Sequence, residues 1–509
     1  MSKFEDYFNK EFIELKDKQK DIKELLTSEN MYLISGDFYG IQKFIFDGLT
    51  TKNAAKVLRA KSAFVQLFTS VISKYICNKL GIDEKYILST NAGKFEILSP
   101  TIDENILKDI QKTINQYFIK NFYGLSGINI CFVSCVKDDF EESKKYKILR
   151  EKIANEIEKA KFKKFDLQTQ DSTLSYDENI SNQTLCKVCN IRKIKHKEAC
   201  EICDDFISLG KKLTTFRIDE IVKSDSLGIK FDDFVCDLII DEKIKSYVAK
   251  NNNEILEFED FAKNSQGAKA IAILKADVDG MGNFIKNSEI TNSFENFDLF
   301  SKTLDNFFSL YIPRKMQEKF PNTYTVFAGG DDLFLLGSWD VILELARFIE
   351  NEFKRFVKSK DITISFGIAL AKPSKPISYL AHETEHLLEE SKDLNGKDAI
   401  TLFGETVKWN SYKEVFKVLN QELEKIDEKD INTAFLYRLL DFCEMSKKVK
   451  EFPLENMWKS KLVYSFTRNM DKKYISILNI LNDLIEKNPR ETKITICEFI
   501  YKRRKNGTD

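Results

Sequence analysis

Residues 326–336 read VFAGGDDLFLL: two apolar runs are joined by Gly329 and Gly330, and two carboxylates, Asp331 and Asp332, follow at once. The pattern predicts a β-hairpin, because Gly-Gly supplies the positive φ angles of a tight primed turn and lacks the Cβ atoms that would keep a triphosphate away. Two adjacent carboxylates repel each other unless a cation lies between them. The stretch therefore indicates either a metal-binding hairpin tip or a solvated turn with two incidental acids.

A second acidic strand favours the metal site. Residues 271–280, IAILKADVDG, form an apolar run that ends in Asp-x-Asp-Gly. Mg²⁺, or Mn²⁺ in its place, takes oxygen ligands, commonly one or two carboxylates and substrate phosphates. Two-metal phosphoryl chemistry needs little more from a protein, because the metals activate the attacking hydroxyl and neutralise the leaving pyrophosphate. The predicted metal ligands and catalytic acids are Asp277, Asp331 and Asp332, and the predicted nucleotide contacts are Val278, Asp279, Gly280, Gly329 and Gly330. A helix N-cap or a turn is the alternative role for Asp277 or Asp279.

The chain contains an internal repeat. Residues 37–45, DFYGIQKFI, match residues 277–285, DVDGMGNFI, in their Asp, their Gly and their closing Phe-Ile. Residues 91–98, NAGKFEIL, echo the hairpin, since 57 residues separate Asp37 from Lys94 and 54 separate Asp277 from Asp331. Chance is the alternative, but the coincident spacing favours duplication.

The two copies are predicted to differ in chemistry. Aligning AGKF at 92–95 with GGDD at 329–332 puts Lys94 in the place of Asp331, so the first copy cannot hold the same metals. We expect a pseudo-dimer in which the second copy catalyses and the first presents a second nucleotide. Asp37 and Lys94 are the predicted nucleotide contacts of the first copy.

Four cysteines form two CxxC pairs, Cys186 with Cys189 and Cys200 with Cys203, ten residues apart. This spacing predicts one tetrahedral Zn²⁺ held by four thiolates, which stabilises a ribbon too short to bury its own core. A four-cysteine site has no open coordination position, so the predicted role of zinc is structural. A redox pair of dithiols or an empty ribbon is the alternative, and His196 between the pairs could replace a ligand.

The order of elements in residues 264–408, strand, helix, hairpin, helix and strand, is that of a ferredoxin-like palm. Lys392 and Lys397 close its last predicted helix and the loop after it, and are placed either to reach triphosphate oxygens or to remain solvated at a helix C-terminus.

In the same helix His382-Glu383-Thr384-Glu385-His386 matches HExxH, the zincin signature. The surrounding acids and lysines favour a solvated helix face instead. In the predicted helix at 51–80, Lys56, Arg59 and Lys61 either contact phosphate or RNA or form a charged face.

Composition limits the remaining possibilities. The 509 residues include 80 acidic and 79 basic ones, and a net charge of −1 gives no global field that would attract nucleic acid or a membrane. No run approaches the roughly 18 apolar residues of a membrane span, and we expect a cytoplasmic protein.

The predicted class is α+β, with two ferredoxin-like (GGDEF/cyclase-type) palm domains, a zinc-ribbon insert and a C-terminal α-helical bundle. The predicted segments are an N-terminal helix packed on the first domain (1–30), a first, degenerate palm (31–160), a linker region with the ribbon (161–263), a second, catalytic palm (264–408) and a helical domain (409–509).

Four landmarks in this order and spacing, residues 36–44, the paired CxxC, residues 277–282 and residues 329–332, resemble the large subunit of type III CRISPR effector complexes, subtype A by overall pattern. The resemblance covers nearly the whole chain. It implies Mg²⁺-dependent synthesis of cyclic oligoadenylate from ATP when the complex recognises target RNA. The implied partners are the small and backbone subunits, crRNA and target RNA, with no membrane.

One feature departs from this family. Many members begin with an HD nuclease domain, but the sequence has no His-Asp dipeptide, so HD-type DNase activity is not expected. Two alternative functions stay open. One is a stand-alone dinucleotide cyclase resembling the GGDEF family, which expects Glu and Phe where this chain has Asp332 and Leu333. The other is a non-catalytic scaffold subunit of an RNA-guided complex.

Overall fold

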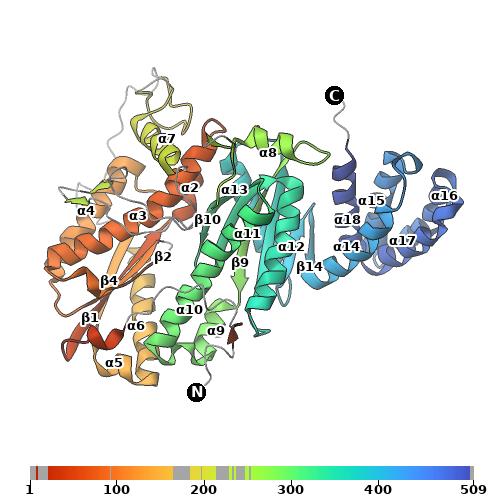
Figure 1. Cartoon of the computed structure of the whole chain (residues 1–509). Coiled ribbons are helices and arrows are strands. Elements are labelled where there is room, and N and C mark those ends of the chain that lie inside the picture. Colours follow the sequence, from red (N-terminus) through yellow and green to blue (C-terminus); the bar gives the residue numbers. More distant parts are fainter. Residues whose placement is uncertain are drawn as a thin grey trace.

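The computed structural model describes residues 7–9, 21–91, 93–163, 184–195, 198–213, 229–231, 234–236, 247–251 and 254–504. Two units of mixed α and β structure lie side by side (Figure 1). A cysteine-containing segment packs on the first unit, and a helical domain follows the second (Figure 1). The predicted α+β class is confirmed.

The first unit is a four-stranded antiparallel sheet with the strand order β2-β3-β1-β4. Its elements are β1 (Asn30–Tyr39), α2 (Ile41–Phe46), α3 (Ala54–Leu80), β2 (Ile87–Asn91), β3 (Lys94–Ser99), α4 (Glu104–Phe122), β4 (Gly127–Val136), α5 (Asp138–Glu141) and α6 (Ser143–Phe162). Asp103 caps α4 by accepting hydrogen bonds from the N–H groups of Asn105 and Ile106. The long α3 buries most of its side chains, so this helix forms the centre of the unit's core.

The second unit is a six-stranded sheet with the strand order β10-β11-β9-β12-β13-β14, whose first four strands repeat the order of the first unit. The elements before the hairpin are α8 (Phe258–Asn264), β9 (Ile271–Asp279), α9 (Met281–Asn287), the 3-10 turn η7 (Glu289–Asn292), α10 (Phe294–Asn306), a π-helical turn (Phe307–Tyr311) and α11 (Ile312–Lys319). The hairpin and later elements are β10 (Thr323–Gly329), β11 (Asp332–Ser338), α12 (Trp339–Phe356), β12 (Thr363–Ala371), α13 (Ile377–Asp393), β13 (Ala399–Leu402) and β14 (Glu405–Lys408). Residues 247–249 extend this sheet beyond β10, because the N–H of Ala249 donates to Thr323 and the N–H of Thr325 donates to Tyr247.

The central strand β9 separates two cores. Its even-numbered residues, such as Leu274 and Ala276, pack with α12, whereas Ile271 and Ile273 join a core that is continuous with the first unit. Successive side chains of a strand point to opposite faces, so one face of the second sheet is turned toward α13 and the first unit. Asp277 and Asp279 belong to that same odd-numbered face.

The two units contact each other reciprocally. Helix α13 of the second unit touches α2 of the first, and α6 of the first touches η7, which follows α9 of the second. In each direction the helix after the fourth strand meets the segment after the first strand, as expected for a pseudo-two-fold pair. The ring centroids of Phe46 and Phe334 lie 4.5 Å apart, and Tyr324 donates a hydrogen bond of 2.6 Å to the carbonyl of Ala55. These contacts fix the two sheets against one another.

The C-terminal domain has its own core of apolar residues from five helices. These are α14 (Trp409–Glu424), α15 (Thr433–Lys448), α16 (Trp458–Asn469), α17 (Ile475–Lys487) and α18 (Pro489–Arg503). Arg347 of α12 forms a buried ion pair of 3.0 Å with Glu498 of α18, which ties this domain to the second unit. None of the helices in the described ranges has both the length and the apolar character needed to span a bilayer.

The structure corrects two expectations. The predicted N-terminal helix lies mostly outside the described residues. Ile22, Leu25 and Leu26 pack on the first domain as expected, but Phe8 packs in the core of the second unit and forms a bridge to Val357. In α3, Lys56 pairs with Glu257 at 3.1 Å, and Arg59 and Lys61 are buried. These three cations therefore form neither an RNA-facing surface nor a solvated face.

Candidate functional site

The predicted hairpin forms between β10 and β11, with Gly330 and Asp331 as its two turn residues. Gly330 has a φ angle of +64°, whereas Gly329 ends the strand opposite Asp332 and has no positive φ. The prediction of a Gly-Gly turn with positive φ at both glycines is therefore wrong by one position. A positive φ at the first central residue alone fits a type II′ turn, which favours Gly there. The N–H of Gly330 donates to the buried carboxylate of Asp305 at 3.2 Å and so anchors the turn to α10.

Asp332 and Asp277 are direct partners on neighbouring strands. Burial, and then the charge of Asp277, raise the pKa of Asp332 to about 7, and a hydrogen bond joins the two side chains. Burial and Asp277 also raise the pKa of Asp331. Two half-buried carboxylates this close repel each other when both carry charge, and a cation between them relieves the repulsion, which suits an ion of the Mg²⁺ class.

The predicted trio of metal ligands does not converge fully. Within the described residues, the sole group of three or more acidic, Cys or His ligand atoms lying within 4.8 Å of one another is the cysteine cluster. Asp277 and Asp332 form the adjacent pair, and Asp331 stands beside them at the turn.

Asp279 takes a different role from the predicted nucleotide contact. Its Oδ2 accepts hydrogen bonds from Thr363 Oγ1 at 2.8 Å, Ser365 Oγ at 2.7 Å and the N–H of Asp398 at 3.1 Å. The side chain is 3% exposed. Its carboxylate is thus used inside the fold, where it joins β9 to β12 and to the loop after α13.

The other predicted contacts of the second unit surround the carboxylate pair. Lys392, at the end of α13, forms an ion pair with Asp277 Oδ2. The N–H of Val278 donates to the carbonyl of Asp331 at 3.2 Å and holds the hairpin tip against β9. Gly280 caps α9 with a φ of +75°, and a Cβ there would lie 2.6 Å from the carbonyl of Asp361. Lys397 lies in the loop after α13 with a φ of +46°, and its side chain has no hydrogen bond or ion pair with any residue the structure describes.

The first unit repeats this arrangement with different charges. Asp37 pairs with Lys94 across β1 and β3, in the register of Asp277 with Asp332. Lys94 therefore corresponds to Asp332, and the sequence alignment that paired it with Asp331 is shifted by one residue. The hydrogen bonds at the two hairpin tips support this correspondence. The N–H of Phe38 donates to the carbonyl of Gly93 in the first unit, as the N–H of Val278 donates to the carbonyl of Asp331 in the second.

The first unit has a further cation that the sequence analysis missed. Lys161, near the end of α6, lies 3.9 Å from Asp37 Oδ2, and Lys94 lies 4.0 Å from Oδ1. Burial raises the pKa of Asp37, and both lysines lower it. Because α6 and α13 each follow the fourth strand of their unit, Lys161 corresponds to Lys392. A lysine near the end of that helix in both copies is the signal that could have revealed it.

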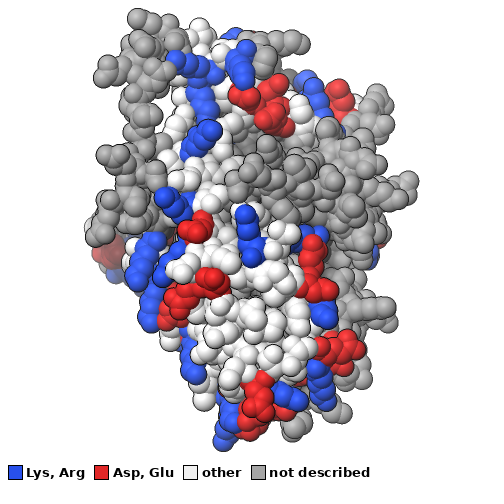
Figure 2. Space-filling view, turned by 90° about the vertical axis from the view of Figure 1, so that its left-hand side faces the viewer, with Lys and Arg blue, Asp and Glu red and all other residues white. Residues whose placement is uncertain are grey.

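The two sites lie near each other across the contact between the units. The positive charge of Lys94 in the first unit lowers the pKa of Asp331 in the second, against the larger effect of burial. One region therefore holds the acidic pair from the second sheet and two lysines from the first. Basic and acidic side chains are interspersed over the described part of the molecule's side seen in Figure 2, rather than one sign covering it.

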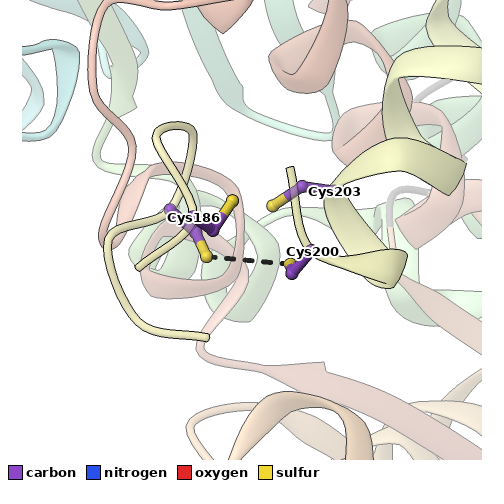
Figure 3. Close-up of side chains that lie close together, drawn as sticks. Cys186, Cys200 and Cys203 are labelled. Atoms are coloured by element: carbon purple, nitrogen blue, oxygen red, sulfur yellow. Dashed lines mark hydrogen bonds between the residues drawn. The ribbon is translucent and has the colours of Figure 1, made fainter. Parts of the chain in front are cut away.

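The four predicted zinc ligands converge. Their sulfur atoms lie within 4.8 Å of one another, and Cys189 and Cys200 are 3.9 Å apart, close to the edge of a tetrahedron of zinc-bound thiolates. Figure 3 shows the sulfur atoms of Cys200 and Cys203 turned toward the pair that includes Cys186. Hydrogen bonds with Cys200 and Cys203 lower the pKa of Cys189, and the hydrogen bond with Cys189 raises the pKa of Cys203 and, to about 11, that of Cys200. The donor set fits Zn²⁺, and His196 lies outside the described residues.

The HExxH segment is a solvated helix face, as expected. The His382 and His386 side chains are 73% and 70% exposed, and their carboxylate neighbours are Asp47 and Glu390. Glu385, between them, pairs with Lys275.

Family models match both units. Residues 270–401 match the model described as Cas10/Cmr2, second palm domain, and residues 30–178 match the Csm1 subunit domain B. Fold and site thus define the second unit as a palm domain of the Cas10 type. The chain belongs to the Cas10 family, the large subunits of type III CRISPR effector complexes.

Known relatives extend this similarity to most of the chain. It is 26% identical to the Cas10/Csm1 (subtype III-A) single-strand-specific deoxyribonuclease of Methanocaldococcus jannaschii, over 86% of this chain and 68% of the relative. The similarly named Streptococcus thermophilus protein is 24% identical, over 86% of this chain and 62% of the relative. A crystal structure of the Csm1-Csm4 cassette in complex with cA3 matches with a TM-score of 0.69 and 19% identity, over 94% of this chain and 70% of that one.

Proposed function

We propose that this chain is the large subunit of a type III-A RNA-guided antiviral complex, and that its second palm joins ATP into cyclic oligoadenylate when target RNA is bound. The observation that carries the proposal is the half-buried Asp277 and Asp332 pair, with Lys392 beside it and Lys94 of the first unit near enough to lower the pKa of the adjoining Asp331. Solved relatives of the same fold include Csm1-Csm4 cassettes with one ATP and with cA4. This chain carries the acidic hairpin that such chemistry requires.

In this proposal the acidic hairpin holds the catalytic ions. Asp277 and Asp332, assisted by Asp331, would bind Mg²⁺ or Mn²⁺, which would activate the attacking hydroxyl and stabilise the leaving pyrophosphate. Partial burial of Asp332 lowers the local dielectric constant and so strengthens the attraction between its carboxylate and a bound cation. Lys392 offers its ammonium to the triphosphate oxygens, and Lys397 stands in the adjoining loop.

The first unit binds the second nucleotide in this proposal, as a degenerate palm. Asp37, Lys94 and Lys161 carry a net charge of +1, which suits a phosphate rather than a metal ion. The reciprocal contact between the units brings the two nucleotides together, so that the hydroxyl of one can approach the phosphate of the other.

The remaining parts of the chain support this role. The four cysteines hold a structural Zn²⁺, which supplies folding free energy to the ribbon. The partners we propose are the other effector subunits, crRNA and target RNA, in the cytoplasm, and the solved relatives contain Csm4. An internal pair of units also removes the need for the homodimer that a stand-alone GGDEF-like cyclase would form.

The test is incubation of the chain, alone and in its complex, with labelled ATP and Mg²⁺, with and without complementary target RNA. Products are resolved by mass, and Asp331→Ala/Asp332→Ala is the control variant. We expect adenylate oligomers only with target RNA, and none from the variant in an intact complex. No turnover under any condition would leave a scaffold role. Labelled single-stranded DNA in the same reactions tests the prediction that HD-type DNase activity is absent.

A further inference from the structure

The cysteine cluster is joined to the first unit by a small cavity. The cavity measures about 40 Å³ and lies between α2, α3, the loop at 122–126 and both CxxC pairs. Cys189, Cys203, Lys61 and Arg192 line it. A volume of this size has room for a few water molecules. The thiols thus share one cavity with three cations, Lys43, Lys61 and Arg192, and with the carboxylate of Asp47.

Lys61 is an unusual group in this position. Its residue is 9% exposed, and no carboxylate of a described residue lies within ion-pair distance of its ammonium. The ammonium lies 5.6 Å from the centroid of the Phe44 ring. Burial lowers the pKa of Lys61 to about 8, and Arg192 lowers it further, whereas negative charge on Cys203, Cys189 and Asp47 acts in the opposite direction. A buried ammonium costs free energy unless a negative partner compensates it.

The zinc site would supply that negative charge. Four thiolates around Zn²⁺ carry a net charge of −2, which is itself costly to bury. Arg192 Nη1 lies 4.0 Å from Cys189 Sγ, so this guanidinium compensates one of the two charges. Arg192 also donates to the carbonyl of Asn121 at 2.5 Å and stacks on Tyr123, which fixes the ribbon to the first unit. One negative charge of the zinc site remains for the Lys61 ammonium in the same cavity, and Asp47, which also lines the cavity, adds a more weakly acting one.

We propose that Lys61, together with Arg192, neutralises the zinc-bound thiolates, so that zinc binding clamps the cysteine ribbon onto α2 and α3 of the first unit. This inference rests on the proposed zinc site and goes beyond it. Zinc retention then depends on a residue of the first unit, far from the ribbon in sequence. Because α2 begins at Ile41, just after the strand that carries Asp37, the clamp also supports the first unit's nucleotide site.

The experiment measures zinc in the full chain for the wild type, Lys61→Met, Lys61→Arg and the control Lys43→Met. Lys43 lines the same cavity but is exposed. Zinc per chain is determined by elemental analysis, and the rate of zinc transfer to a colorimetric chelator is followed. We expect Lys61→Met to lose zinc about 10- to 100-fold faster, the usual effect of removing an outer partner of a metal site. Lys61→Arg should stay within about threefold of the wild-type rate, because the positive charge at position 61 is kept. Lys43→Met should do the same, because Lys61 itself is unchanged.

Thermal unfolding separates charge compensation from a purely structural role. Without zinc, Lys61→Met should be as stable as the wild type or more stable, because a buried unpaired charge is removed. With zinc it should gain less in melting temperature than the wild type gains. Equal loss in both forms, or an unchanged rate of zinc transfer, would overturn the proposal. The proposal would also be overturned if inorganic phosphate raised the melting temperature of the wild type but not that of Lys61→Met, because the cavity would then be an anion site. A wild type without zinc would refute the zinc site itself.

Discussion

The two units use one backbone arrangement for opposite charges. In the second unit Asp277, Asp332 and Lys392 carry a net charge of −1, and in the first unit Asp37, Lys94 and Lys161 carry +1. The difference rests on a single register position, occupied by Asp332 in one sheet and Lys94 in the other. A duplicated fold can therefore provide a cation site and an anion site by changing the cross-strand partner of one aspartate that both units share, while the strand order stays the same.

The largest expected effect comes from converting the second site into the first. Asp332→Lys should reduce cyclic oligoadenylate synthesis by about 10³-fold or more, because several kcal/mol of metal-dependent transition-state stabilisation are lost. Product is measured in the assembled complex with target RNA, and Asp393→Ala, at the exposed end of α13, is the matched control. Retention of more than about a tenth of the activity would refute the role of the acidic pair.

Removing the cations of the first site should give a smaller effect. Lys94→Ala and Lys161→Ala are each expected to raise the KM for ATP about 10- to 100-fold, since a hydrogen bond to a charged group contributes roughly 1.5–3 kcal/mol. Lys94→Arg should preserve most of the affinity. If both alanine variants kept the wild-type KM, the first unit would not bind the second nucleotide.

The pH dependence of Mg²⁺ binding should distinguish the two sites further. Because the pKa of Asp332 is raised from 3.8 to about 7, the metal-free chain holds a proton there at lower pH, and its stability falls as pH rises from about 4 to about 7. Mg²⁺ must displace that proton, so its affinity should weaken about tenfold per pH unit below pH 7. Mg²⁺ titrations monitored by thermal shift at pH 5.5, 6.5 and 7.5 check this. Asp332→Asn should abolish the slope, and a pH-independent midpoint in the wild type would contradict the prediction.

The smallest effect tests the repeat through its packing. A Cβ on Gly36 would lie 1.9 Å from the ring of Phe95, its partner on β3, whereas the corresponding pair in the second unit is Ala276 and Leu333. Gly36→Ala should destabilise the first unit by about 1–3 kcal/mol through overpacking. The double variant Gly36→Ala/Phe95→Leu should recover most of this loss, as measured by urea unfolding. Strictly additive losses would argue against equivalence of the two positions.

Much of the site could be read from local patterns. The hairpin at Gly330, the carboxylates that follow it and the two CxxC pairs each depend on neighbouring residues, and the structure brings the cysteines together as their spacing predicts. The repeat was also visible, because Asp37 and Asp277 begin matching segments. Errors began where one residue of register mattered, as in the pairing of Lys94.

The sequence by itself determined which chemical groups this protein carries and that it carries two related units, because turn residues, strand ends and ligand spacing act over a few positions. Only the tertiary structure decided how those groups are used. It paired Lys161 with Asp37, enclosed Asp279 among β12 hydroxyls, and buried Lys61 beside the cysteines. These outcomes depend on strand register and on contacts between distant segments, more than a hundred residues apart for Lys161 with Asp37 and for Lys61 with the cysteines. A local sequence pattern contains no information about such contacts.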